Sequence, residues 1–247
     1  MEKHRGTWIV FVLAMAFNLM AVHIAFSGMV IDGKIGDLEW QDAQEFTFST
    51  ENPSFDITGL VKWDTEYFYF ACIIEDPEVV GKHEEGIQNV WEDDDVEFYL
   101  ETDNKKHDGR SVNSYQLLFS AAGAYNDTVG DGVTFVFAWD SDVEHVAALL
   151  DGATINDGGD TDAGWSVESR LPWEDMDVDG DDVEGETMGW NILVADYPKA
   201  NVFNWSDKVD GWNNNHNCSV WGEITFNEGR VAVEPQGKLS TVWGAIK

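Results

Sequence analysis

Short runs in which apolar and polar residues alternate constrain this chain more than any other feature of its sequence. Side chains of a strand point alternately to its two faces, so runs of period two indicate strands with one buried face. Such runs occur at residues 57–63, 67–75, 96–100, 115–119, 133–139, 165–171, 190–194 and 220–226. Asp-Gly, Asn-Asp and Gly-rich breaks separate them, whereas residues 143–150 fit either a helix or a strand. Many short strands joined by such turns predict an all-β fold, an antiparallel β-sandwich of the jelly-roll or immunoglobulin-like type.

The first 27 residues have the pattern of a secretory signal peptide. A basic start at residues 3–5 precedes an uncharged run over residues 8–26, and residues 25–27 form a small-x-small cleavage site. An uncleaved membrane anchor is the alternative, since the uncharged run has the length of a bilayer span. We therefore expect a secreted, extracellular or periplasmic protein, which stays anchored to the membrane if this segment is not cleaved.

The rest of the chain is expected to form one domain, because no linker rich in Pro or Ser divides it. We place this domain at residues 28–227 and a C-terminal tail at residues 228–247. With 43% hydrophobic residues, the domain can bury a large core.

Acidic residues outnumber basic ones by 47 to 14, which gives a net charge of −33. Nucleic-acid binders neutralise phosphates with Lys and Arg, so this composition excludes nucleic-acid binding through a basic face. It also argues against docking on an anionic lipid surface. The many carboxylates instead offer oxygen ligands to hard cations.

Two cysteines, Cys72 and Cys218, are present. In an exported protein they are candidates for one disulfide. Two buried free thiols are the alternative, and the sequence leaves both open.

Many of the twelve tryptophans stand in short motifs spread along the chain. In chain order these motifs are Ile31-Asp32-Gly33-Lys34, Lys62-Trp63-Asp64, Glu75-Asp76-Pro77, Trp91-Glu92-Asp93-Asp94-Asp95, Gly164-Trp165, Leu171-Pro172-Trp173, Gly189-Trp190-Asn191-Ile192, Trp205-Ser206-Asp207 and Trp221-Gly222. Their succession resembles the family 9 carbohydrate-binding modules over about 200 of the 247 residues. The resemblance implies a β-sandwich, often with bound calcium, that holds a sugar between two tryptophans and does no chemistry.

The resemblance also implies individual binding residues. The two stacking tryptophans correspond to Trp91 and Trp212, and a carboxylate that binds sugar hydroxyls corresponds to Glu97. Asp196 matches a further polar position, whereas a basic residue of the family falls at Leu118. We therefore expect the sugar to be bound by Trp91, Glu97, Gln116, Asp196 and Trp212.

The residues suit a sugar on chemical grounds as well. Aromatic rings cover the apolar C–H faces of a pyranose, and carboxylates and amides bind its hydroxyls. Alternation over residues 95–100 predicts an apolar face for the core and a polar face that carries Glu97 and Tyr99. Six other tryptophans are expected in the core: Trp40, Trp63, Trp165, Trp173, Trp190 and Trp221.

A calcium-binding loop is predicted at residues 175–186. Asp at the first, third and fifth positions, Gly at the sixth and Glu at the twelfth match the EF-hand ligand pattern. Pro172 and a strand-like run at residues 189–194 flank the loop, so the helices of an EF-hand are not expected. A solvated acidic loop is the alternative. The expected ligands are Asp175, Asp177, Asp179, Asp181 and Glu186.

Three functions fit these features. The first is non-catalytic, extracellular binding of a polysaccharide or oligosaccharide, in support of a secreted glycoside hydrolase or a cell-surface sugar-uptake system. The second is electron transfer through a bound haem, which needs axial ligands such as Met with His. Beyond the signal segment the methionines are Met29, Met176 and Met188. The third is a secreted glycosidase or lyase, for which Asp94 and Glu97 offer a carboxylate pair.

Overall fold

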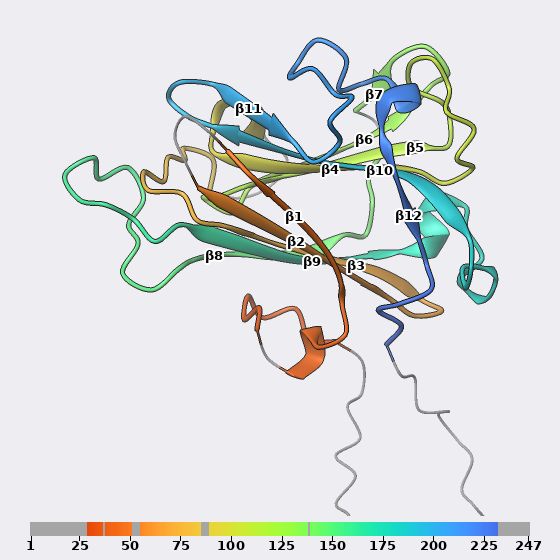
Figure 1. Cartoon of the computed structure of the whole chain (residues 1–247), viewed down its shortest axis with the longest axis horizontal. Helices are drawn as coiled ribbons and strands as arrows, with labels where there is room; N and C mark the ends of the chain where they lie inside the picture. The colour runs from red at the N-terminus through yellow and green to blue at the C-terminus, as the bar shows by residue number, and fades with distance from the viewer. Residues whose placement is uncertain (1–28, 37, 51–54, 85–88, 138, 232–247) are drawn as a thin grey trace, which may run out of the picture.

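Two antiparallel sheets lie face to face in the computed structural model of the chain (Figure 1). The structure describes residues 29–36, 38–50, 55–84, 89–137 and 139–231. The sheets enclose one apolar core, so the predicted all-β sandwich is confirmed. None of the helices in these residues is long and apolar enough to span a bilayer.

The smaller sheet has five strands in the order β1-β2-β3-β9-β8. Their bounds are β1 Gln44–Ser49, β2 Asp56–Trp63, β3 Tyr67–Ile74, β9 Trp165–Pro172 and β8 Glu144–Leu149. The ambiguous run at residues 143–150 is therefore a strand, which pairs with β9 at the sheet edge.

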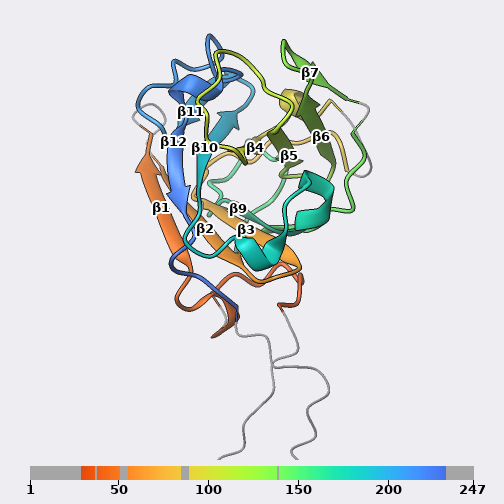
Figure 2. The same ribbon diagram turned by 90° about the vertical axis from the view of Figure 1, so that its right-hand side faces the viewer.

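The larger sheet has seven strands, six of them in the order β11-β10-β4-β5-β6-β7. Their bounds are β11 Asn201–Asn204, β10 Thr187–Asp196, β4 Asp95–Glu101, β5 Ser114–Ser120, β6 Tyr125–Gly130 and β7 Phe135–Val136. The seventh strand, β12 (Gly222–Thr225), pairs with the first half of β10. Figure 2 shows β7 at one side of this sheet, across from β11 and β12.

Five short 3-10 helices lie in the connections of the described chain. They are η1 Leu38–Trp40, η2 Val90–Glu92, η3 Trp173–Met176, η4 Gly180–Asp182 and η5 Cys218–Val220.

Aromatic side chains fill the space between the sheets. Trp63, Trp165, Trp173 and Trp190 are buried there, together with the inward-facing residues of β4. Trp40 is buried against the outer side of the five-stranded sheet, and Trp221 against the outer side of the seven-stranded sheet. All six tryptophans expected in the core are therefore buried.

The outer side of the seven-stranded sheet carries a second apolar cluster. Tyr99 and Leu193 project from the sheet and are covered by Val209, Cys218 and Trp221 of the segment between β11 and β12. This covering segment also supplies one wall of the pocket described below.

Of the two possibilities that the sequence leaves open for Cys72 and Cys218, the structure has two free thiols. Cys72 lies in the core between the sheets, whereas Cys218 lies in the cluster on the outer side of the seven-stranded sheet. Both are buried free thiols, because a sheet separates the two side chains.

The two ends of the chain fall largely outside the described residues, which exclude the predicted signal segment 1–27 and the tail from residue 232 onward. The first tail residues lie against β2, where Trp63 N donates to Gly229 O at 3.0 Å and Val231 N donates to Trp63 O at 2.7 Å. Gly229 has a φ of +75°, and a Cβ there would lie 2.7 Å from Val61 O. Residues 228–231 therefore pack as part of the sandwich.

Candidate functional site

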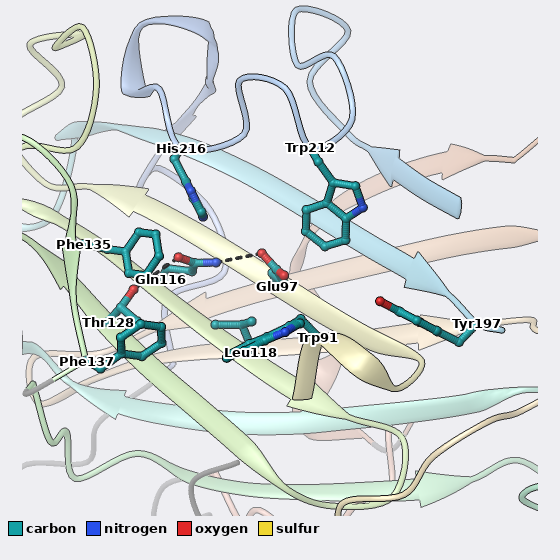
Figure 3. Close-up of a pocket in the computed structure, with 10 residues that line it drawn as sticks. All are labelled: Trp91, Glu97, Gln116, Leu118, Thr128, Phe135, Phe137, Tyr197, Trp212 and His216. Atoms are coloured by element: carbon teal, nitrogen blue, oxygen red, sulfur yellow. Dashed lines mark hydrogen bonds between the residues drawn. The ribbon is translucent and has the colours of Figure 1, made fainter. Parts of the chain in front are cut away.

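A pocket of about 290 Å³ opens on the outer side of the seven-stranded sheet (Figure 3). Neighbouring strands supply its floor, and four connections supply its walls. The lining residues are Trp91, Glu97, Gln116, Leu118, Thr128, Phe135, Phe137, Tyr197, Trp212 and His216. Four of the five predicted sugar-binding residues, Trp91, Glu97, Gln116 and Trp212, therefore line one pocket.

Two indole rings lie on opposite sides of this pocket. Trp91 belongs to η2 and packs against the small apolar cluster that includes Leu118. Trp212 comes from the covering segment, and 42% of its surface is exposed. Glu97 lies on the floor between them (Figure 3). The opening is therefore bounded by apolar ring faces and has a carboxylate at its centre.

A buried hydrogen-bond network orients that carboxylate. The Tyr99 hydroxyl and Gln116 Nε2 both donate to Glu97 Oε2, the second over 2.8 Å. Asn215 Nδ2 in turn donates to the Tyr99 hydroxyl at 3.0 Å. Burial raises the pKa of Glu97 to about 7. Because both donors use Oε2, Oε1 accepts no hydrogen bond from the described residues and is available to a ligand.

Arg110 fixes the amide of Gln116 from below. Its Nη1 donates to Gln116 Oε1 at 2.9 Å, and Thr128 Oγ1 donates to the same oxygen at 3.2 Å. The amide nitrogen must then point toward Glu97. Arg110 is almost fully buried and also bonds Ser114, so it supports the site without lining it.

The pocket lining carries no Lys or Arg among the described residues. Leu118, where the resemblance places a basic residue, contributes an apolar side chain. Burial and the nearby Arg110 lower the pKa of His216 to about 4, so its imidazole is neutral at pH 7. The pocket therefore presents no cation to a ligand.

Asp196 does not line the pocket, contrary to the prediction. It ends β10, where Val194 faces the inner core and Ala195 faces outward, so alternation turns Asp196 inward. There it meets Asp76 and Asp94, and one oxygen of each lies within 4.8 Å of the others. All three carboxylates are inward-facing continuations of β3, β4 and β10 at one end of the sandwich.

Mutual repulsion and burial perturb this acidic group. Burial, followed by the charge of Asp76, raises the pKa of Asp94 to about 9, and burial raises the pKa of Asp76 to about 6. Asp94 also accepts hydrogen bonds from the backbone N–H groups of Val80 at 2.5 Å and Tyr197 at 2.6 Å. Three converging carboxylates are the ligand type that calcium prefers.

No three carboxylates of the predicted calcium loop lie within 4.8 Å of one another. Asp175 accepts a hydrogen bond from Asp142 N at 2.7 Å, and Asp179 caps η4 by accepting from Asp181 N. Asp177 takes a left-handed conformation with a φ of 53° between η3 and η4. Neither group of potential metal ligands in the described chain includes a residue of this loop, although Asp177, Asp179 and Glu186 line one surface pocket.

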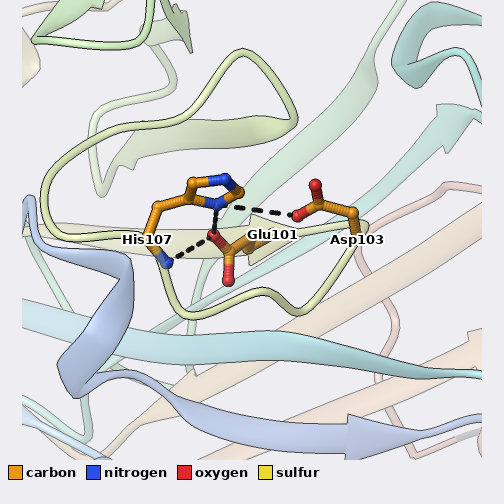
Figure 4. A group of neighbouring side chains, drawn as sticks. All are labelled: Glu101, Asp103 and His107. Atoms are coloured by element: carbon orange, nitrogen blue, oxygen red, sulfur yellow. Dashed lines mark hydrogen bonds and ion pairs between the residues drawn. The ribbon is translucent and has the colours of Figure 1, made fainter.

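The second such group joins Glu101, Asp103 and His107 (Figure 4). His107 Nδ1 lies 2.7 Å from Glu101 Oε1 and 3.8 Å from Asp103 Oδ1. Buried Glu101 also accepts hydrogen bonds from the backbone N–H groups of Lys106 and His107. These bonds explain the group as the support of the loop after β4.

Six lining residues were not predicted to bind sugar: Leu118, Thr128, Phe135, Phe137, Tyr197 and His216. Thr128 reaches the pocket because it pairs with Gln116 across β5 and β6, which requires the register of the sheet. Tyr197 and His216 were signalled only by their closeness in sequence to Asp196 and Trp212.

Residues 31–229 match the model of the carbohydrate family 9 binding domain-like family. The endo-1,4-beta-xylanases A of Thermotoga maritima and Thermotoga neapolitana are each 24% identical to this chain, over 212 and 202 residues. Each match covers 78% of this chain but 16% and 17% of the respective enzymes, so the chain spans about a sixth of their length.

Two solved structures of a family 9 carbohydrate-binding module from Caldicellulosiruptor kristjanssonii have the same fold. They contain cellotriose and glucose, and each superposes with a TM-score of 0.56 at 18% identity. The superpositions cover 81% of this chain and 90% and 92% of those modules.

Proposed function

Because the chain belongs to the carbohydrate family 9 binding domain-like family, as its tryptophan motifs indicate, we propose that it binds a neutral oligosaccharide in the pocket without catalysis. One observation carries this proposal: Trp91 and Trp212 lie on opposite sides of an opening with Glu97 between them. A pyranose in that opening has both C–H faces covered by indole rings. Glu97 Oε1 then accepts a hydrogen bond from a sugar hydroxyl.

Charge selects a neutral sugar over an anionic one. The described lining offers no cation, and the net charge of −33 repels uronic acids and sulfated sugars. Glu97 is a hydrogen-bond acceptor when ionised, which favours hydroxyl groups as its partners.

The alternative functions have less support in this geometry. Hydrolysis of a glycosidic bond ordinarily uses two carboxyl groups that flank it. Glu97 is the carboxylate in the described lining, whereas Asp94 lies in the inward-facing acidic group. Met176 and Met188 are buried in the core and Met29 in a smaller cluster, so no methionine of the described chain faces His216 in the pocket.

We further propose a structural calcium ion, held by Asp76, Asp94 and Asp196 in place of the predicted loop. The ion would neutralise three buried carboxylates and join the ends of β3, β4 and β10. Asp94 also bonds the backbone of Tyr197, a pocket residue, so this end of the sandwich supports the binding site.

Added calcium should therefore raise the melting temperature of protein that has been freed of metal ions by a chelator. The increase should be larger at pH 8 than at pH 5. At the lower pH, protons compete for Asp94 and Asp76, whose pKa values are raised to about 9 and about 6. Asp94→Asn should abolish the increase, whereas Asp175→Asn in the predicted loop should keep it. If Asp175→Asn abolishes the increase and Asp94→Asn keeps it, the calcium ion binds at residues 175–186 instead.

The predicted signal peptide and the similarity to the two xylanases support a location outside the cytoplasm. A segment like this chain forms part of each of those longer enzymes. We propose that the protein acts outside the cytoplasm and supports a secreted glycoside hydrolase or a cell-surface sugar-uptake system.

A tryptophan-fluorescence titration tests the binding proposal. Neutral gluco- and xylo-oligosaccharides should change the emission saturably, and glycans rich in uronic acid should not. Trp212→Ala should abolish the response to the neutral sugars. The matched control is Leu38→Ala, which truncates a 66% exposed side chain of η1 beyond the other sheet. Equal binding by Trp212→Ala and the parent would refute the site.

A further inference from the structure

We propose that Phe135 and Phe137 form a second sugar subsite, continuous with the opening between Trp91 and Trp212. The inference rests on the proposed function. It assigns the pocket to an oligosaccharide whose neighbouring ring lies on the phenyl groups, so the site distinguishes a chain from a single sugar.

The aromatic surface is continuous from one subsite to the other. The Phe137 ring centroid lies 6.1 Å from that of Trp91 and 5.0 Å from that of Phe135. Phe135 in turn lies 4.8 Å from the His216 ring. All these rings line the pocket, and Figure 3 shows the two phenyl rings to one side of Glu97, with Tyr197 on the other. A ligand that fills the first subsite thus meets aromatic carbon when it extends toward β7.

The phenyl rings are held by a defined hairpin. Val129 and Gly130 of β6 pair with Val136 and Phe135 of β7. In the turn, Asp131 Oδ1 accepts hydrogen bonds from Val133 N at 2.9 Å and Thr134 N at 2.7 Å. Phe135 belongs to β7 and Phe137 follows directly after this strand, and both line the pocket.

A close backbone contact fixes this hairpin to the sheet. A Cβ on Gly130 would lie 2.0 Å from Ser111 O, so the glycine lets the hairpin approach the loop that precedes β5. The platform is therefore positioned before a ligand arrives, which limits the entropy lost on binding.

The Phe137 ring is largely exposed, so packing of the protein alone does not account for an aromatic residue at this position. Its exposed fraction is 53%, although it contacts Trp91 and Phe135. Large exposed apolar groups that gather beside a pocket mark ligand-binding surfaces. The rest of this chain is strongly acidic, with a net charge of −33, so an exposed phenyl ring beside the pocket suits a ligand that carries apolar C–H groups.

The chemistry of the platform indicates what it recognises. Phenyl rings offer no hydrogen bond, and the nearest lining hydroxyl, that of Thr128, already donates to Gln116. The two phenyl rings therefore contribute to binding through stacking. The second subsite favours a pyranose with equatorial hydroxyls, whose C–H face is flat, over one with an axial hydroxyl directed at the ring.

Calorimetric titration with glucose and cellotriose, the sugars bound in the two structural relatives, tests the subsite. The parent should bind cellotriose more tightly than glucose. Phe137→Ala should weaken cellotriose binding about fivefold to tenfold and glucose binding by less than about twofold. Phe137→Trp should restore the preference. Val133→Ala is the matched control, because it truncates an 84% exposed side chain at the tip of the same hairpin.

The outcomes separate this inference from the function on which it rests. Unchanged cellotriose binding by Phe137→Ala, or equal losses for both sugars, would overturn the second subsite and leave the first standing. If the parent binds neither these sugars nor xylo-oligosaccharides, the proposed binding of neutral oligosaccharides itself fails. Near-ultraviolet circular dichroism of each variant checks that the fold is intact.

Discussion

The two faces of β4 carry different side chains and serve different purposes. On the inner face, the ring centroid of Phe98 lies 5.0 Å from that of Phe70 and 5.8 Å from that of Trp190, and all three rings are enclosed between the sheets. On the outer face, Glu97 and Tyr99 form a hydrogen-bonded floor beneath an open pocket. One strand thus anchors the core and presents the site, so the functional groups gain the rigidity of the sheet.

The tryptophans show the same contrast. Trp190 is fully enclosed by aromatic neighbours, whereas Trp212 keeps 42% of its surface exposed. What lies opposite the ring decides its role: a second sheet for Trp190 and an open space for Trp212. Substitutions on the two faces should therefore separate stability from binding.

The largest effect is expected on the inner face. Phe98→Ala removes a buried ring from the densest part of the core and should lower the free energy of unfolding by about 3–5 kcal/mol. Urea unfolding followed by circular dichroism measures this loss. The affinity of the molecules that remain folded should stay within about twofold of the parent. A large loss of affinity in the folded fraction would show that the two faces are coupled through β4.

A smaller effect is expected from the protonation of Glu97. Its pKa is raised to about 7 by burial, so a rise in pH from 6 to 8 ionises the carboxylate inside the pocket. An ionised acceptor binds a hydroxyl more strongly than a neutral acid does, and neutral-sugar affinity should rise about fivefold. Titrations across this range, with calcium present throughout, measure the change.

The same group should affect stability in the opposite direction. The folded pKa of Glu97 lies above the ordinary value of 4.5, so the native state holds this proton more tightly than the unfolded chain. Its contribution to stability is complete below pH 4.5 and is lost as the pH rises through about 7. Glu97→Gln should flatten both profiles. A pH-dependent affinity that persists in this variant would assign the titration to another group.

The strands that the sequence predicted are those with strong alternation. β2, β3, β4, β5, β9, β10 and β12 were all anticipated, because each has one face in the core. The predicted run at residues 133–139 shrinks to the two residues of β7, because Asp131 holds residues 133 and 134 in a turn. β6 was missed because its central residues, Asn126, Asp127 and Thr128, are polar on both faces, so pairing with β5 defines it.

The site was predictable only in part for a related reason. Motif resemblance identified Trp91 and Trp212, and alternation placed Glu97 on the polar face of its strand. Phe135 and His216 come from segments far apart in sequence, and only the pairing of β7 and the path of the covering segment bring them together. Asp196 was expected in the pocket from its motif, but the alternation of side chains along β10 turns it inward.

The smallest effect is expected from reducing agents. Cys72 and Cys218 lie on opposite sides of the seven-stranded sheet as free thiols, so dithiothreitol should leave the melting temperature and the sugar affinity unchanged. Loss of a native disulfide would instead cost about 2–5 kcal/mol. Thermal melts with and without the reductant, together with a thiol count on the denatured protein, measure the difference. A drop of several degrees, or a count of zero thiols, would mean that the two sides of the sheet are joined covalently. The inner and outer faces of the sheet could then no longer be treated as independent.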